Sequence, residues 1–263
     1  MKIALIGGGA MGEAIAQCLL MKKVAAPDGM VVSDISPARR ELFNRDYGVS
    51  AVADNIEATK KADLIILAVK PQNLPQVMHE IKGFASEQLV LSIVAGAGLS
   101  NLCHGLDHSS IVRAMPNMPA QIGEGMTIWT ATTETDQRQK KLAQTVLGAL
   151  GKEIYVADEK YLNMATALSG SGPAYVFLFI EALVDAGVHI GLPRDMAQEL
   201  VIQTVLGSTR TAEKTGKHPA DLRNMVTSPG GTTTEALFQL EKGGFRSLLL
   251  EAVAAAYKKA ERL

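Results

Sequence analysis

The residues best suited to bind an anion lie near the C-terminus, between Thr227 and Glu235. They read Thr-Ser-Pro-Gly-Gly-Thr-Thr-Thr-Glu and stand directly before an apolar stretch with helical periodicity. Hydroxyls and glycines at the start of a helix leave several backbone N–H groups exposed, and such a nest suits a carboxylate. The alternative is a capping box, with a threonine at the N-cap and Glu235 near the third helical position. Capping alone does not require Ser-Pro-Gly-Gly before three threonines.

A glycine cluster near the N-terminus is the second group that points to a ligand. Gly7, Gly9 and Gly12 follow the apolar run 2–6 and open an amphipathic helical pattern. In the dinucleotide fingerprint, one glycine permits a tight turn, the next lets backbone approach a pyrophosphate, and the third lets helix and strand pack closely. The N–H groups at that helix start then face the phosphates. Because the cluster stands between a strand and a helix, we interpret it as a nucleotide site rather than a flexible loop.

The segment after the second apolar strand bears on which nicotinamide cofactor fits. An acid about twenty residues past the glycines bonds the ribose 2′-hydroxyl of NAD, whereas an arginine nearby accommodates the 2′-phosphate of NADP. Asp34 has the spacing expected of the acid, yet Ser33, Ser36 and Arg39 are the types that surround a phosphate. The sequence therefore leaves NADP(H) and NAD(H) both open. Arg40 is interpreted as part of a solvated helical turn.

The composition is that of an ordinary globular protein and excludes several functions. Of 263 residues, 47% are hydrophobic and 20% are charged, and the formal net charge is −1 without a basic block. Nucleic acids and anionic membranes attract clustered lysine and arginine, so neither is an expected partner. Cys18 and Cys103 stand far apart without a ligand pattern, so we expect buried thiols in a reducing compartment and no metal. The start of the sequence shows no secretory signal, which predicts a cytoplasmic protein.

Apolar runs in the first half predict the strands of a doubly wound α/β domain. The run 62–69 is continuous and ends in Lys70-Pro71, as suits a central parallel strand. The run 88–94 closes on Ala95-Gly96, where small residues let a ligand approach the backbone, and strand ends of this kind collect at one edge of such a sheet. Strands are predicted over 2–6, 30–33, 62–69, 88–94, 111–119, 125–130 and 153–156, with a helix over 135–150, in a first domain of residues 1–157.

From Asp158 onward the pattern is helical and no strand is predicted. The stretch 174–188 is apolar nearly all round, which raises the question of a membrane span. Glu181, Asp185 and His189 fall at successive steps of four, and such an ionisable stripe is costly in lipid. We therefore expect this helix to be buried between its own domain and a second subunit, and we do not interpret the stripe as a metal site. Further helices are predicted over 194–214, 219–225, 233–241 and 246–262.

Together these motifs resemble the pyrroline-5-carboxylate reductases, the enzymes of the last step of proline synthesis from glutamate. The resemblance covers nearly the whole chain and implies a Rossmann-type domain followed by an all-helical domain, residues 158–263. It also implies intertwined homodimers, which can assemble further into decamers. The motifs are IGGGAMG at 6–12, AVKP at 68–71, RAMPN at 113–117, SGSGPAY at 169–175 and, above all, SPGGTT at 228–233 with EAL at 235–237.

The resemblance also implies two groups of site residues. Asp34 departs from the pattern, because an uncharged residue is expected beside a 2′-phosphate. Arg39 is included among the expected cofactor contacts because an arginine at this place can bind the 2′-phosphate of NADP. The expected cofactor contacts are Ile6, Gly7, Gly8, Gly9, Ala10, Met11, Ser33, Arg39, Asn55, Ala68, Val69, Lys70, Pro71, Val94, Ala95 and Gly96. The expected substrate contacts are Ser228, Gly231, Thr232 and Thr233.

The implied reaction is hydride delivery from the nicotinamide to the C=N carbon of 1-pyrroline-5-carboxylate, which yields L-proline. The cofactor performs the hard step, and the protein orients and desolvates the reactants. By the resemblance, the hydroxyl of Thr233 faces the imine nitrogen and is the catalytic group. An imine nitrogen is basic, so a site of hydroxyls and amides without histidine is sufficient.

Two other interpretations are weighed against this one. The β-hydroxyacid dehydrogenases and related imine reductases share the plan but place a lysine on the first long helix after the nucleotide domain. No lysine stands between Tyr161 and Val188. A nucleotide-sensing protein without catalysis has no need of the hydroxyl-rich segment 228–233.

Overall fold

The computed structural model describes residues 1–83 and 88–262 and divides the chain into two compact units. The sheet unit comprises residues 1–171 and 256–263, and the helical unit comprises residues 172–255. The predicted boundary at residue 157 lies before helix α7 (Lys160–Ala165), which packs on strands of the sheet unit. Because Leu162 and Ala167 are buried, the compact unit extends past that boundary.

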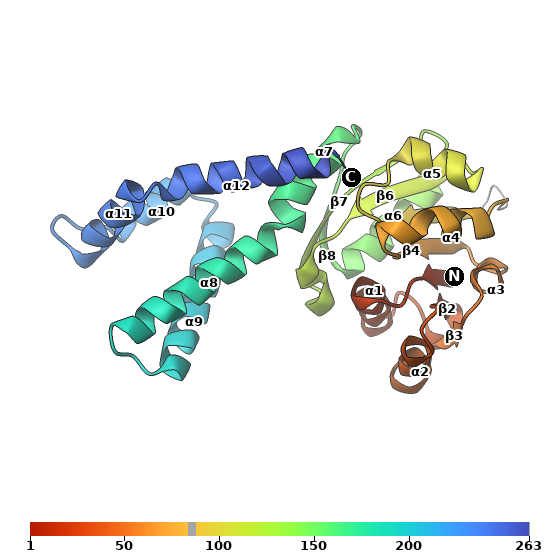
Figure 1. Cartoon of the computed structure of the whole chain (residues 1–263), viewed down its shortest axis with the longest axis horizontal. Coiled ribbons are helices and arrows are strands. Elements are labelled where there is room, and N and C mark those ends of the chain that lie inside the picture. The colour runs from red at the N-terminus through yellow and green to blue at the C-terminus, as the bar shows by residue number, and fades with distance from the viewer. Residues whose placement is uncertain (84–87, 263) are drawn as a thin grey trace. The chain divides into compact units, whose positions relative to one another are not determined.

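The sheet has eight strands in the order β3-β2-β1-β4-β5-β6-β7-β8 (Figure 1). Neighbouring strands are parallel except for β6 and β7. All seven predicted strands are confirmed, and the run 111–119 ends at Met115, before Pro116, which has no N–H to donate to the ladder. The strands are β1 Ile3–Ile6, β2 Met30–Ser33, β3 Ser50–Val52, β4 Leu64–Leu67, β5 Leu89–Ser92, β6 Ile111–Met115, β7 Gly125–Ala131 and β8 Gly151–Tyr155.

Strand β3 is the one that the sequence analysis missed. It has only three residues, lies at the edge of the sheet and is not fully buried at any position, so it lacks the apolar run that marks β1 or β4. The helices of the sheet unit are α1 Ala10–Met21, α2 Pro37–Asp46, α3 Asn55–Thr59, α4 Leu74–Glu80, α5 Leu99–Leu106, α6 Gln137–Ala149 and α7 Lys160–Ala165.

Helices cover both faces of the sheet, which explains why its central strands are buried throughout. Successive residues of a strand point to opposite faces. Leu5 packs in a cluster with side chains of α1, α2 and α6, whereas Ile6 packs in a second cluster with side chains of α3, α4 and α5. From β1 the sheet is extended in one direction by β2 and β3 and in the other by β4 and β5, so the strand order reverses between β1 and β4. In sheets of this kind, ligands bind in the crevice at the carboxyl ends of the strands at that point.

The helical unit contains no strand among its described residues, as predicted. Helices α8 and α9 pack side by side, and Gly187 lies so close to Ala197 that a Cβ there would be 3.0 Å from the alanine methyl (Figure 1). The rings of Phe179 and Phe245, 6.3 Å apart, join α8 to α12. The helices are α8 Gly172–His189, α9 Arg194–Thr215, α10 Pro219–Met225, α11 Thr232–Lys242 and α12 Phe245–Ala260.

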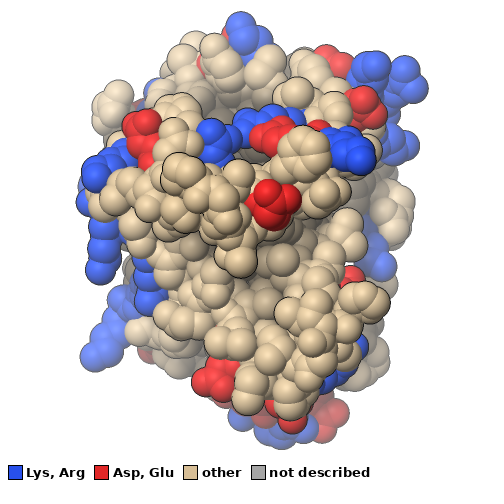
Figure 2. Space-filling model, turned by 90° about the vertical axis from the view of Figure 1, so that its left-hand side faces the viewer, with Lys and Arg blue, Asp and Glu red and all other residues tan. Residues whose placement is uncertain are grey.

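Helix α8 exposes much of its apolar surface within the single chain. Phe177 and Leu178 are 51% and 66% exposed, and Val176 and Phe179 are exposed as well. Figure 2 shows a broad surface of uncharged side chains at the left-hand end of Figure 1, with charged residues scattered over it. The helical stretch Lys160–His189 is the one described segment long and apolar enough to cross a membrane by length and composition.

The two cysteines differ in their surroundings. Cys18 is buried and its thiol donates a hydrogen bond to the Ala120 carbonyl, as its apolar neighbours predict. Cys103 is only partly buried, so the prediction of two buried thiols is wrong for this residue. It lies on α5, a surface helix whose buried face is formed by Leu102 and Leu106. Both thiols are free, and burial raises the pKa of each.

Candidate functional site

The glycine turn between β1 and α1 has the backbone geometry of a phosphate-binding loop. Gly7 has φ +103°, and a Cβ there would lie 2.7 Å from the carbonyl oxygen of Ala68. A Cβ on Gly12 would collide with the carbonyl oxygen of Gly7. Gly9 is different, because its backbone is extended and an added Cβ would meet nothing within 4 Å. Gly7 and Gly12 are therefore required by the turn, whereas Gly9 keeps space open at the start of α1.

A cavity of about 400 Å³ lies at the carboxyl ends of β1, β2 and β4. It brings together half of the predicted cofactor residues, which come from segments far apart in the sequence. Predicted residues that line it are Ile6, Gly7, Gly9, Ser33, Asn55, Ala68, Val69 and Lys70. Residues that line it without having been predicted as cofactor contacts are Asp34, Ile35, Ala53, Asn73, Gln76, Val77 and Glu80.

The other predicted cofactor residues do not line this cavity. Gly8, Ala10 and Met11 belong to the glycine turn and the first turn of α1, and Pro71 follows Lys70. Val94, Ala95 and Gly96 follow β5, the strand that pairs with β4. Because β4 and β5 are parallel, their carboxyl ends lie at the same edge of the sheet.

Ser33 and Asn55 are held together at the end of β2. The Ser33 hydroxyl donates to Asn55 Oδ1 at 2.7 Å, and Asn55 Nδ2 donates to Glu80 Oε2 at 2.7 Å. Gln76 donates to the other carboxylate oxygen of Glu80 at 2.9 Å. These hydrogen bonds fix the orientation of the Asn55 amide, which lines the cavity. The sequence analysis missed Glu80 and Gln76, because no local pattern connects α4 to Asn55.

Asp34 fastens the glycine turn to the start of α2. Its Oδ2 accepts from the Gly8 N–H at 2.7 Å, and its Oδ1 accepts from the Ser36 N–H at 2.8 Å. Both oxygens therefore have a backbone donor, while the residue also lines the cavity. Asp34 therefore has a structural role, through its bonds to Gly8 and Ser36, in addition to the ribose contact that its spacing predicts.

Arg39 and Arg40, in the first turn of α2, both bind protein groups. Arg39 donates from Nε to the Gly8 carbonyl at 2.5 Å and from Nη2 to Glu13 Oε2 at 2.6 Å. Arg39 does not line the cavity. Arg40 donates from Nη1 to the carbonyls of Asp34 and Ile35, at 2.8 and 3.0 Å. Arg40 lies in the first turn of α2 and is only partly buried, as a solvated turn allows, and its guanidinium also binds the carbonyls of the loop after β2.

The motif at 113–117 holds the carboxyl edge of the sheet together. Arg113, which is buried, pairs with Glu159 at 2.6 Å, and the same carboxylate oxygen accepts from the Leu99 N–H at 2.8 Å. The Asn117 amide donates to Ser169, and its oxygen accepts from the Met126 N–H at 2.8 Å. Ser169 lies in a π-helical turn, Thr166–Gly170, an element that often marks functional sites.

Replacing Glu159 by alanine is expected to destabilise the fold, because Arg113 would keep a buried charge without its partner. The side chains of Arg113 and Glu159 are 9% and 33% exposed, so we expect a loss of roughly 2 kcal/mol, less than for a fully buried pair. Thermal or urea unfolding measures it. Asp46→Ala is the control, because its pair with Arg45 is exposed to solvent and its loss should change the stability little. Equal losses in both variants would contradict this assignment.

In the helical unit, the predicted anion nest lies at the N-terminus of α11. Gly230 has φ +67°, and Gly231 is the N-cap, with no side-chain capping hydrogen bond. The capping-box alternative is therefore wrong: no threonine occupies the N-cap, and Glu235 is one position beyond the third helical residue. A Cβ on Gly231 would lie 2.5 Å from the Ser228 hydroxyl oxygen, so a side chain there would displace that hydroxyl.

Three threonines follow Gly231, and only one of them stabilises the loop. Thr234 donates its hydroxyl to the Ser228 carbonyl at 2.6 Å and holds the turn closed. The hydroxyls of Ser228, Thr232 and Thr233 have no hydrogen-bond partner within the part of the chain that the structure describes. With the first N–H groups of α11, they form a set of donors suited to a carboxylate. These residues belong to the helical unit, and the cofactor residues belong to the sheet unit.

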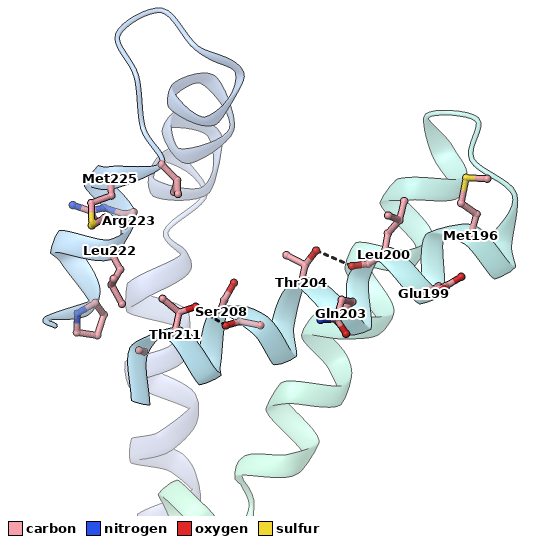
Figure 3. A pocket seen from close by; sticks show the side chains of 14 residues that line it. Met196, Glu199, Leu200, Gln203, Thr204, Ser208, Thr211, Leu222, Arg223 and Met225 are labelled. Atoms are coloured by element: carbon pink, nitrogen blue, oxygen red, sulfur yellow. Dashed lines mark hydrogen bonds between the residues drawn. The ribbon is translucent and has the colours of Figure 1, made fainter. Parts of the chain in front are cut away.

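A second hollow, in the helical unit, has a different character. It measures about 1040 Å³ and is formed by the facing sides of α9 and α10 (Figure 3). Leu200, Leu222 and Met225 give it an apolar lining, and the hydroxyl of Thr204 is already bonded to the Leu200 carbonyl. Such a groove suits apolar side chains better than a small charged ligand. Among the described residues, no group of three His, Cys, Asp or Glu side chains is placed to hold a metal ion.

Comparisons with known proteins agree with these features. A family model described as pyrroline-5-carboxylate reductase dimerisation matches residues 159–263, and one described as NADP oxidoreductase, coenzyme F420-dependent, matches residues 2–96. The chain is similar to the pyrroline-5-carboxylate reductase of Synechocystis sp., with 44% identity over 100% of this chain and 98% of the relative. It is 38% identical to the Escherichia coli enzyme over 100% of this chain and 98% of the relative.

Solved structures extend the likeness to three dimensions. A pyrroline-5-carboxylate reductase from Coxiella burnetii superposes with a TM-score of 0.91 and 39% identity, covering 99% of this chain and 97% of the other. A Plasmodium falciparum pyrroline carboxylate reductase with NADP bound gives a TM-score of 0.92 and 32% identity, covering 100% and 97%. A reductive aminase from Aspergillus terreus, with 16% identity and a TM-score of 0.60, shares the fold alone.

Proposed function

Because the chain belongs to the pyrroline-5-carboxylate reductase family, we propose that its sheet unit holds NAD(P)H and its helical unit holds the carboxylate of the imine. The protein is an NAD(P)H-dependent oxidoreductase that reduces the C=N bond of 1-pyrroline-5-carboxylate to L-proline, the last step of proline synthesis from glutamate. By role, the proposed domains are residues 1–157 for the cofactor and residues 158–263 for substrate and dimerisation, whereas the compact sheet unit also takes in residues 158–171 and 256–263.

The cleft of the sheet unit fits a dinucleotide. Gly7 lacks room for a Cβ, whereas the space above Gly9 is open, so backbone N–H groups at the start of α1 are accessible to phosphates. When bound, the cofactor supplies the hydride. We assign the ribose end to Ser33 and Asn55, and the remaining contacts to the predicted residues of the glycine turn and of the segments that follow β4 and β5.

The uncapped N-terminus of α11 carries the substrate assignment. A carboxylate placed there receives hydrogen bonds from backbone N–H groups and from the Ser228 hydroxyl, and the helix dipole favours its charge. The Thr233 hydroxyl then bonds the imine nitrogen and supports its protonated form as the hydride arrives. Thr232 is assigned as a further contact of the substrate, and the absence of a side chain at Gly231 leaves room for the Ser228 hydroxyl near the start of the helix.

A spectrophotometric assay tests this function directly. Oxidation of NADPH or NADH is followed with 1-pyrroline-5-carboxylate as the varied substrate, and proline is identified as the product. We expect turnover with both cofactors, because Asp34 and Ser33 present features of both ribose sites. Absence of turnover with either cofactor would refute the proposal.

We propose that the protein acts as a homodimer or a larger assembly built from dimers, including decamers, in the cytoplasm. A dimerisation domain matches the helical residues 159–263. The exposed Phe177 and Leu178 of α8 and the groove between α9 and α10 are apolar surfaces that a second copy of the chain would cover. Nucleic acids and membranes are not among the proposed partners.

Placing a charge on α8 is expected to break the assembly. Leu178→Asp should give a monomer with little or no reductase activity, because a carboxylate buried in an apolar interface lacks a partner. Light scattering measures the mass. Met21→Asp is the control, since this exposed residue lies on α1 of the sheet unit and its change should leave the mass unaltered. A stable, fully active monomer of either the variant or the natural protein would contradict the proposal.

A further inference from the structure

The ion pair between α1 and α2 places an arginine next to the nucleotide cleft but turns it away from the cavity. Arg39 lies in the first turn of α2, the helix that follows Asp34 and the ribose end of the site. Its guanidinium donates to Glu13 and to the Gly8 carbonyl and lies over the Phe43 ring, 5.7 Å from the ring centroid. Asp34 lines the cavity, and Arg39 does not.

Glu13 holds this arginine firmly. The side chains of Glu13 and Arg39 are each only 28% exposed, so solvent weakens their attraction less than it does for surface pairs. The other oxygen of Glu13 accepts from the Tyr47 hydroxyl at 2.8 Å, which fixes the carboxylate in place. Arg39 holds the pKa of Glu13 below its ordinary value, so the carboxylate is charged at neutral pH. Burial, and secondly the bond to Glu13, raises the pKa of Tyr47 to about 12, so Tyr47 remains a donor.

Glu13 stands in the first turn of α1, the helix whose N-terminus faces the phosphates in this fold. Without Arg39, a carboxylate at this position would repel a bound dinucleotide. The ion pair with Arg39 therefore neutralises the negative charge of Glu13. It also withholds the Arg39 guanidinium from the ribose end. Among the described residues lining the cavity, the one lysine or arginine is Lys70, which follows β4 rather than β2.

We propose that Glu13 sets the balance between NADPH and NADH by binding Arg39 in place of the ribose 2′-phosphate. This inference rests on the proposed assignment of the cleft to NAD(P)H. With Arg39 held by Glu13, and with Arg40 bonded to the carbonyls of Asp34 and Ile35, a 2′-phosphate meets the carboxylate of Asp34 without an arginine free to bind it, so NADPH gains little over NADH. Removing the charge of Glu13 frees the guanidinium, which forms strong charge-assisted hydrogen bonds with a phosphate.

Titration of the full-length protein with 2′,5′-ADP and with 5′-AMP tests the inference without the reaction, because the two probes differ only in the 2′-phosphate. Glu13→Gln should tighten binding of 2′,5′-ADP by about ten- to a hundredfold, the range expected for one charge-assisted hydrogen bond, and change 5′-AMP binding by less than about twofold. The ratio of kcat/KM for NADPH over that for NADH should rise by a similar factor.

Two further variants separate this role from simple support of the loop. In an Arg39→Gln background, Glu13→Gln should no longer favour 2′,5′-ADP, because no guanidinium remains to be released. Arg39→Gln alone should weaken 2′,5′-ADP relative to 5′-AMP by less than about twofold, since the arginine does not yet bind the phosphate. A tenfold relative loss in that variant, or equal changes for both probes in Glu13→Gln, would overturn the inference. Failure of imine reduction would refute the proposed function but would leave these titrations to decide the role of Glu13.

Discussion

Replacing Thr233 by alanine is expected to lower kcat by about ten- to a hundredfold. A hydrogen bond to a group that gains a proton in the transition state contributes roughly 1.5–3 kcal/mol, which corresponds to this loss in rate. The melting temperature should stay nearly constant, because Thr233 is not the N-cap of α11 and its hydroxyl makes no hydrogen bond among the described residues. Steady-state kinetics and thermal unfolding of the same variant measure both effects.

Two comparisons make the Thr233 result specific. Ser228→Ala should act mainly on KM for the imine, because a carboxylate is bound similarly in the ground state and the transition state. Thr145→Ala, on the exposed side of α6 in the sheet unit, should leave kcat and KM unchanged. A Thr233→Ala enzyme with the natural kcat and a lowered melting temperature would refute the catalytic role and show a structural one.

Replacing Gly9 by valine is expected to abolish detectable cofactor binding while the protein remains folded. The backbone of Gly9 is extended, with φ −68° and ψ −172°, a conformation that valine adopts readily. An added Cβ meets no protein atom within 4 Å, so its methyl groups would occupy the open side of the turn, where the phosphates are proposed to bind. We expect a loss in affinity of at least about a hundredfold, because the helix N–H groups are then blocked.

Fluorescence titration with NADPH and NADH measures the loss, and circular dichroism checks the fold. Gly148→Val is the matched control, since this glycine of α6 also has no atom within 4 Å of an added Cβ and lies outside the cavity. It should leave the affinity unchanged and should not weaken the helix, because valine has a higher helix propensity than glycine. Unchanged affinity in Gly9→Val would mean that the glycine cluster serves only the turn.

Together these two experiments separate the two halves of the proposed site. Gly9 acts through the sheet unit and should affect every reaction that uses the dinucleotide. Thr233 acts through the helical unit and should leave binding of NADPH unaltered. A Thr233→Ala protein that lost cofactor affinity would show that the division between the units is wrong.

The amino-acid sequence alone determined the parts of the protein that depend on local backbone conformation. Apolar runs bounded by Gly and Pro located β1 and β4, because a parallel strand covered by helices on both faces must be apolar at every position. Positive φ at Gly7 and Gly230 follows from their placement in tight turns. The nest before α11 was likewise visible, because hydroxyls and glycines at a helix start act within a few residues of each other.

Only the tertiary structure decided which side chains face the cavity and which bind each other. Arg39 is 26 residues from Glu13, and Asn55 is 25 residues from Glu80, so no periodicity connects either pair. Their contacts exist because α1 packs near α2 and α3 near α4 on a common sheet. The sequence could place Asp34 and Arg39 together at the ribose end, but the direction of each side chain depends on partners that folding brings from elsewhere. The charge around the proposed cofactor site is therefore a property of helix packing, whereas the glycine turn proposed to bind its phosphates is a property of the local sequence.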